Sequence, residues 1–305
     1  MAFKSLFLFL LIFNTLLFSG SITPIPLHMD VNVEKARLGK KLFSDTLLSR
    51  DNTISCATCH QLQAGGDDGL AFSFGIQGRE GSINSPTVYN AVFNFRQFWD
   101  GRAADLQEQA LGPIENPAEM GNTFNNLIRT LNKTAYKKEF SKIYKEGITR
   151  QSITNAITEY EKTLITPNAP FDKFLMGHKN AISQETKEGF ILFKEKGCIA
   201  CHHGINIGGN LYNKFGIMNP AKSTNLGRYN VTKREQDKYY FKVPSLRNVA
   251  LTAPYFHDGR HQELKNAVKD MAYYQLGRPI SEDEIHKIVL FLNSLTGEIP
   301  KETPQ

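Results

Sequence analysis

The four cysteines of the chain occur as two copies of the motif C-x-x-C-H, and the sequence contains no other cysteine. The two copies comprise Cys56, Cys59 and His60, and Cys198, Cys201 and His202. This spacing lets two thiols bond covalently to the two vinyl groups of a haem while the following histidine binds the iron. The motifs therefore predict two covalently attached c-type haems.

Four cysteines could also form two disulfides, a thioredoxin-like redox motif or a four-thiolate zinc site. None of these uses needs a histidine directly after the second cysteine of each pair. The strand–helix–strand pattern typical of thioredoxin does not surround either motif. Haem attachment explains all six residues and is the favoured interpretation.

Other residues recur at matching positions around the two motifs, which indicates an internal duplication. A proline and an Asp-Gly-Arg tripeptide follow each motif with the same 14-residue step between the proline and the aspartate. The matched pairs are Gly39 and Gly189, Leu42 and Leu192, Phe43 and Phe193, Pro86 and Pro244, Asn90 and Asn248, and Asp100 and Asp258. The sequence thus predicts a mainly α fold of two cytochrome c-like haem domains with long irregular loops.

The two halves differ where a sixth iron ligand would stand. In the second half, Leu264, Val268 and Met271 follow helical spacing, so Met271 lies on the inner face of a helix and is a candidate axial ligand. Counting equally from the Asp-Gly-Arg tripeptide, the first half has Pro113, which cannot bind a metal. We expect an open sixth position at the first haem.

The half without a sixth ligand also gains polar side chains. Gln109 stands where the second half has Ala267, and Glu119 stands where it has Gly277. This difference predicts that chemistry takes place at the first haem.

Other ligands for the second haem stay open on sequence grounds. Met271 could be an ordinary core methionine, and Met218 lies in a loop rich in Gly, Asn and Pro that could reach the iron. His257 and His261 are further candidates, although they could instead bond haem propionates or line the interface between the halves.

The chain begins with an apolar run that ends in small residues, and we interpret residues 1–21 as a cleaved signal peptide. An uncleaved anchor is the alternative, but the run is shorter than a spanning helix needs and no second apolar run follows, so we expect no membrane span in the mature protein.

The remaining chain divides into residues 30–165 and 166–305, and the second part begins with the helix-breaking segment 166–170. Helical patterns cover 34–43, 106–111, 123–131, 153–164, 186–196, 264–271 and 282–295.

The chain carries 36 Lys and Arg against 30 Asp and Glu. This modest excess has no long basic run, and each haem brings propionates that need neutralising. We therefore expect no nucleic-acid partner.

These features together resemble the bacterial di-haem cytochrome c peroxidases, and the resemblance covers nearly all of the sequence after residue 21. The stretches that carry it are 84–88, 97–103, 108–110, 112–114, 119–120, 166–172, 244–249 and 254–260.

The resemblance implies roles for four residues. Gln109 and Glu119 match the pair in the peroxide pocket, and Trp99 matches the tryptophan placed between the haems. Met271 matches the sixth ligand of the electron-accepting haem. Glu119 would move a proton between the two peroxide oxygens, and Gln109 would hydrogen-bond the bound oxygen.

The resemblance also implies partners and a second metal. A calcium ion would lie between the haem domains on oxygen atoms of Asn84, Thr252 and Pro254, which suits the preference of Ca²⁺ for oxygen. The protein would be a periplasmic homodimer that reduces hydrogen peroxide with electrons from a small cytochrome c or a cupredoxin.

One departure from the family pattern concerns its inhibitory histidine. Many members have a histidine in the loop after the first haem motif, yet this sequence has none between His60 and His178. Gln77, Met120 or water could occupy the iron instead, so the need for reductive activation is open.

Two rival functions remain. A related haem enzyme that oxidises tryptophans of a partner protein would use a tyrosine in place of Met271, and Tyr273 and Tyr274 are close in sequence. A plain di-haem electron carrier is the other rival, and it gives Gln109 and Glu119 no task.

Overall fold

The computed structural model describes residues 22–300, so the predicted signal peptide lies outside the described residues. The described chain is mainly helical, with a single two-stranded antiparallel sheet in this part of the chain. Its α-helices are α1 (Val33–Ser44), α2 (Cys56–Cys59), α3 (Leu106–Gln109), α4 (Leu111–Glu115), α5 (Phe124–Leu131), α6 (Tyr136–Ile143), α7 (Arg150–Glu161), α8 (Pro170–Leu175), α9 (Gln184–Glu195), α10 (Tyr229–Thr232), α11 (Leu264–Met271) and α12 (Glu282–Asn293). The strands are β1 (Tyr212–Lys214) and β2 (Tyr240–Lys242), and a π-helix (Ala272–Leu276) continues α11.

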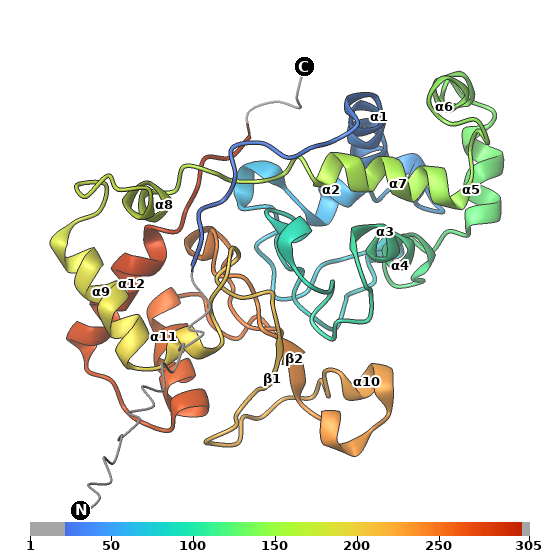
Figure 1. Cartoon of the computed structure of the whole chain (residues 1–305). Coiled ribbons are helices and arrows are strands. Elements are labelled where there is room, and N and C mark those ends of the chain that lie inside the picture. The colour runs from blue at the N-terminus through green and yellow to red at the C-terminus, as the bar shows by residue number, and fades with distance from the viewer. Residues whose placement is uncertain (1–21, 301–305) are drawn as a thin grey trace, which may run out of the picture.

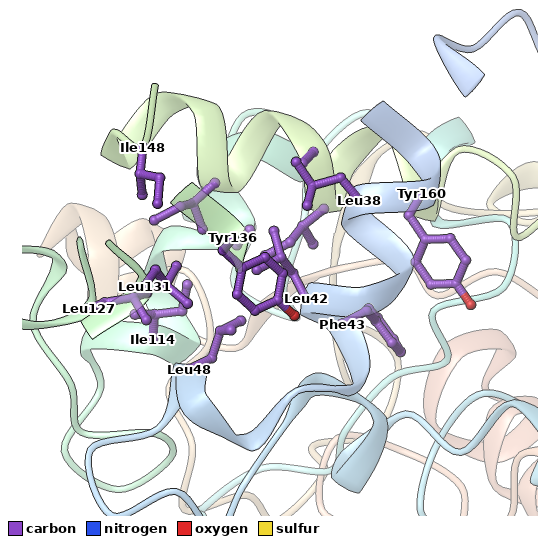
Figure 2. Close-up of a cluster of buried hydrophobic side chains, with 14 of the residues drawn as sticks. Leu38, Leu42, Phe43, Leu48, Ile114, Leu127, Leu131, Tyr136, Ile148 and Tyr160 are labelled. Carbon is purple, nitrogen blue, oxygen red and sulfur yellow. The ribbon is translucent and has the colours of Figure 1, made fainter. Parts of the chain in front are cut away.

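Two apolar cores lie side by side in the molecule. Helices α1 to α7 gather around one core, and α8, α9, α11 and α12 gather around the other (Figure 1). Figure 2 shows the first core, in which side chains of α1 meet those of α4, α5, α6 and α7. Its labelled residues are Leu38, Leu42, Phe43, Leu48, Ile114, Leu127, Leu131, Tyr136, Ile148 and Tyr160. The second core also consists of aliphatic and aromatic residues, and the rings of Phe171 and Phe193 both pack on that of Phe291.

One helix pair in each core packs at very short range through a glycine. A Cβ on Gly39 of α1 would lie 1.9 Å from the carbonyl oxygen of Ala156 in α7. A Cβ on Gly189 of α9 would lie 1.9 Å from the carbonyl oxygen of Lys287 in α12. Only glycine allows these backbones to approach so closely, which explains why both positions carry it.

The segment that joins the two cores is buried and hydrogen-bonded. The hydroxyl of Thr166 accepts hydrogen bonds from the side-chain amides of Asn90 at 2.7 Å and Asn248 at 2.9 Å. Both asparagines have left-handed backbones with φ of 59°. Thr166 thus ties the loops that carry Asn90 and Asn248 to one point, and the segment is a hydrogen-bonded joint despite its loop-like sequence.

The helical patterns in the sequence match the structure closely at several places. The predicted helix 264–271 coincides with α11, and α12 begins with the predicted capping box between Ser281 and Glu284. The expected continuous helix over 106–111 is wrong, because α3 ends at Gln109 and α4 begins at Leu111. Helices α6 and α8 and the small sheet were not predicted. No helix between residues 22 and 300 is long and apolar enough to cross a membrane.

Candidate functional site

The second C-x-x-C-H motif opens into a cavity of the described chain. Its volume is about 380 Å³, and its wall includes Cys198, Cys201, His202 and Met271. Apolar and aromatic residues of α9, α11 and α12 form one part of the wall, and the loops on either side of Trp99 and β2 form much of the rest. A largely apolar cavity beside two thiols and a histidine fits a large planar cofactor such as haem.

Both motif histidines are held so that one ring nitrogen is free. The Nδ1 atom of His60 hydrogen-bonds the carbonyl oxygen of Gly66 at 3.2 Å, and that of His202 hydrogen-bonds the carbonyl oxygen of Ile207 at 3.3 Å. Burial lowers the pKa of both imidazoles, that of His202 to about 4, so both rings are neutral. A neutral imidazole with Nδ1–H donated to a carbonyl presents Nε2 to a metal, which is the state that an axial iron ligand requires.

The four thiols fit haem attachment better than the rival uses. All four cysteines are free and half-buried. Burial raises the pKa of Cys59 and Cys198 to about 11 and that of Cys56 further, so these thiols are poor thiolate ligands or redox nucleophiles. Between residues 22 and 300, no group of three or more Cys, His, Asp or Glu side chains could hold a metal, which excludes a shared four-thiolate zinc site there.

Met271 is the methionine that faces the second motif. It ends α11 and lines the cavity together with Leu264, Val268 and His202. Met218, in contrast, is 59% exposed and packs against Gly277. The π-helix that follows Met271 widens the helix at this point, and such turns are common where a helix serves a functional site.

The other candidate ligands either bond other protein groups or lie outside the cavity wall. His261 pairs through Nε2 with Asp270 at 2.7 Å. His257 is buried, bonds Ser223 at 2.8 Å and stacks on Phe241. It lines the cavity, and its ring also meets that of Trp99 from the first half. Tyr273 is 55% exposed. The observed cavity wall includes neither Tyr273 nor Tyr274.

Glu119 lies close to the first motif. Its negative charge raises the pKa of both Cys56 and Cys59. Burial raises the pKa of Glu119 itself, and this is only partly offset by a 2.6 Å hydrogen bond from the side-chain amide of Asn116 and by the charge of Arg102. A half-buried carboxylate with a raised pKa, held by one directed hydrogen bond, is suited to proton transfer.

The helix that carries Gln109 is interrupted where the second half continues. Gln109 ends α3, and Pro113 stands inside the short helix α4, whereas α11 runs unbroken to Met271. Among the described residues, the Gln109 amide has no hydrogen-bond partner, so its donor and acceptor remain available. At the spacing that corresponds to Met271, the first half has Pro113 and no sulfur ligand, and the Gln109 amide lies four residues earlier in the chain.

Trp99 connects the halves. Its Nε1–H donates to the carbonyl oxygen of Asn84 at 2.9 Å, and its carbonyl oxygen accepts from the N–H of Lys242 at 2.8 Å. Its ring also meets the ring of His257 edge to face and forms part of the cavity wall. The indole thus lies between the first half and the haem cavity of the second.

These features can be compared with known proteins. Residues 33–180 match the family model described as di-haem cytochrome c peroxidase. The chain is 46% identical over 283 residues to cytochrome c551 peroxidase of Nitrosomonas europaea, covering 92% of this chain and 85% of that protein. The chain belongs to the di-haem cytochrome c peroxidase family.

Further relatives agree with this membership. Cytochrome c peroxidase Ccp of Escherichia coli is 48% identical, and the match covers 90% of this chain but 61% of that protein. Among solved structures, a MauG-like protein associated with microbial copper homeostasis aligns with a TM-score of 0.79 at 23% identity, covering 91% of this chain and 93% of that chain, which shows the shared fold. Membership of the family makes the chain an oxidoreductase with two haems.

The three residues matched to the calcium site all line the cavity, beside Trp99. Asn84 is buried. Pro254 forms a cis peptide bond with Ala253, and Thr252 directly precedes Ala253. The same wall contains Asp67, which is 3% exposed and whose Oδ1 has no hydrogen-bond partner. Burial raises the pKa of Asp67 to about 7. A carboxylate with one unpartnered oxygen, in the same wall as amide and carbonyl oxygens, fits a hard divalent cation.

The loop that holds the inhibitory histidine in many family members packs here against Glu119 through its backbone. The N–H of Ile76 donates to the carbonyl oxygen of Glu119 at 2.8 Å, and Ile76 is fully buried. Gln77 is exposed, and its side-chain oxygen accepts from Arg79 at 3.0 Å. Met120 is buried in the first core. The side-chain oxygen of Gln77 is therefore engaged at the surface, and Met120 forms part of the apolar core.

Three polar residues near the sites were missed in the sequence. Asn116 lies three residues before Glu119, a spacing that could have suggested the contact in a short turn. Asp67 follows the glycine pair of the first motif, and Lys242 lies two residues before Pro244, and neither position has a local signal of burial.

Proposed function

We propose that the protein is a periplasmic cytochrome c peroxidase that reduces hydrogen peroxide to two waters with two electrons from a small cytochrome c or a cupredoxin. The observation that carries this proposal is the position of Glu119, whose half-buried carboxylate lies close enough to the first C-x-x-C-H motif to act on Cys56 and Cys59. Haem attached at Cys56 and Cys59 would supply the iron and its redox chemistry, with His60 as the iron ligand. The protein's own residues then bind and orient peroxide and move protons.

Glu119 is the proton carrier in this mechanism. Its carboxylate takes the proton from the inner oxygen of peroxide and returns it to the outer oxygen, which makes water the leaving group. Burial favours a carboxyl group that can hold the proton, and the Asn116 amide fixes which oxygen of Glu119 faces the substrate. The amide of Gln109 donates a hydrogen bond to the peroxide oxygen and orients it.

Electrons enter through the second half. His202 and Met271 would hold the iron of the second haem, and a methionine ligand would raise the reduction potential, which suits an acceptor of electrons. Trp99 lies between this cavity and the first half, and its hydrogen bond to Asn84 orients the indole. We assign it a role in the passage of electrons between the haems.

The first iron stays open in the resting enzyme, under this proposal. Three observations support an open iron. The side-chain oxygen of Gln77 accepts a hydrogen bond from Arg79, Met120 is buried in the first core, and no histidine occurs between His60 and His178. The protein would therefore work without prior reduction.

We also propose how the chain divides into domains, where it binds calcium and how it assembles. Residues 30–165 and 166–305 form two haem domains derived by duplication, and the two cores, the paired glycines and the paired asparagines support this. Calcium binds between them through Asn84, Thr252 and Pro254, with Asp67 as an additional anionic group. The mature protein is a homodimer.

Two measurements on the fully oxidised holoprotein test the proposal. The first is an electron paramagnetic resonance spectrum, and the second is peroxide turnover with reduced cytochrome c and no pre-reduction. We expect a high-spin ferric signal from one haem and immediate turnover. Two low-spin signals with a lag would show that another group closes the iron, and two low-spin signals without turnover would identify an electron carrier instead.

A further inference from the structure

Lys242 is a lysine buried in the wall of the haem cavity. Lys242 is the last residue of β2 and is only 5% exposed. It pairs in register with Tyr212 of β1. Its backbone N–H donates to the carbonyl oxygen of Trp99 at 2.8 Å, which anchors the strand at the interface between the halves. The same cavity wall contains Cys198, His202 and Met271.

The ammonium group of Lys242 has no counter-charge in the protein. Within residues 22–300, it forms neither an ion pair nor a hydrogen bond. Burial lowers its pKa to about 8, and no acidic group raises it again. Asp67 also lines the cavity, but its charge does not shift the pKa of Lys242.

Two other cations of the described residues, the buried Arg247 and the partly exposed Lys196, are compensated. The guanidinium of Arg247 pairs with the carboxylate of Asp172 at 2.6 Å, and Lys196, which also lines the cavity, pairs with Glu284. Burying a charge without a partner is strongly unfavourable, so an uncompensated lysine in a cavity wall indicates that the cavity receives an anion. A haem attached at Cys198 and Cys201 brings two propionates into this space.

We propose that Lys242 binds a propionate of the second haem and that its positive charge raises the reduction potential of that haem. This inference rests on the proposed attachment of haem at Cys198 and Cys201. A cation beside the haem stabilises the state that has gained an electron, so Lys242 acts in the same direction as the Met271 ligand. Lys242 is therefore a positioning and tuning residue rather than a catalytic one.

The backbone contact extends this role. Because Lys242 is held by its N–H to the carbonyl oxygen of Trp99, the strand that carries the propionate partner is fixed to the residue between the two halves. The position of the second haem and that of Trp99 are thereby set by one short segment.

Redox titration of the holoprotein tests the proposal without any peroxide turnover, so its outcome is independent of the proposed activity. Lys242→Met removes the charge and keeps the length of the side chain. We expect the equilibrium constant for reduction of the second haem to fall about tenfold, which is about 59 mV for one electron. Lys242→Arg keeps the charge and should retain most of the wild-type potential.

Lys196→Met is the matched control, since Lys196 lines the same cavity but is already paired with Glu284. We expect it to shift the potential much less. An unchanged potential in Lys242→Met, an equal shift in Lys196→Met, or a shift confined to the first haem would overturn the proposal. Haem content and the low-spin signal of the second haem establish that each variant is folded.

A structure of the wild-type holoprotein decides the contact even if a variant fails to fold. We expect Nζ of Lys242 within about 4 Å of a propionate oxygen of the second haem, the limit for an ion pair. A greater separation from both propionates would refute the inference.

Discussion

The indole of Trp99 meets the imidazole of His257 edge to face, with the ring centroids 6.1 Å apart and the ring planes at 68°. Each residue directly precedes an Asp-Gly-Arg tripeptide, one in each half of the chain. Each follows a phenylalanine with a left-handed backbone, Phe98 with φ of 67° and Phe256 with φ of 72°. The same local turn therefore delivers one ring from each half to the interface, and only the first half supplies an indole.

Replacing Glu119 by Gln tests the proton carrier. Glutamine keeps the size of the side chain but cannot accept and return the peroxide proton, so we expect turnover to fall by about 100-fold or more. Haem content and both haem spectra should stay unchanged. Glu115→Gln is the control, because Glu115 lies on the same segment but is exposed and pairs with Arg150 at 3.2 Å. Equal turnover in both variants would remove Glu119 from the mechanism.

The pH profile of kcat/KM tests the contact between Asn116 and Glu119. The carboxylate must be ionised to accept a proton, so activity falls as pH drops through the pKa of Glu119, which burial raises. The Asn116 amide stabilises the ionised form and lowers that pKa. We therefore expect Asn116→Ala to move the acidic limb to higher pH. Asn132→Ala, an exposed helix-end asparagine, should leave the limb in place. A limb that stays fixed in Asn116→Ala would show that the hydrogen bond does not govern catalysis.

Local patterns in the sequence could predict that Met271 faces inward, and the structure has Met271 in the cavity wall. Met271 could be placed because Leu264, Val268 and Met271 share a helical face and the first half offers Pro113 at the same distance from its tripeptide. The interruption between α3 and α4 was missed, although Gly112 and Pro113 supply its chemical cause.

The charged wall of the cavity could not be predicted in this way. Lys242 and Asp67 are ordinary surface residues by type, and their burial arises from contacts with segments far away in the chain. Asn116 is similar, since its importance depends on where Glu119 points. Long-range packing decides which polar residues face the cofactors, and spacing along one chain does not reveal it.

Replacing Met271 by Leu tests the sixth ligand of the second haem. Leucine fills a similar volume but has no sulfur, so we expect the low-spin signal of the methionine-bound haem to disappear and its reduction potential to fall. Met218→Leu is the control, since Met218 is largely exposed and should leave both the spectrum and the potential unchanged. The reverse pattern, with loss of the signal in Met218→Leu alone, would transfer the ligand role to the loop.

Replacing Asp67 by Asn tests the calcium site. The buried Oδ1 of Asp67 has no hydrogen-bond partner and lies in the wall formed by Asn84, Thr252 and Pro254, so a bound cation would neutralise it. Removing this negative charge should weaken calcium binding by about tenfold or more, measured by calorimetry on chelator-treated holoprotein. Asp68→Asn is the control, because its carboxylate already accepts the N–H of Leu70 at 3.1 Å. If both variants bind calcium as tightly as the wild type, Oδ1 of Asp67 does not contribute to calcium binding.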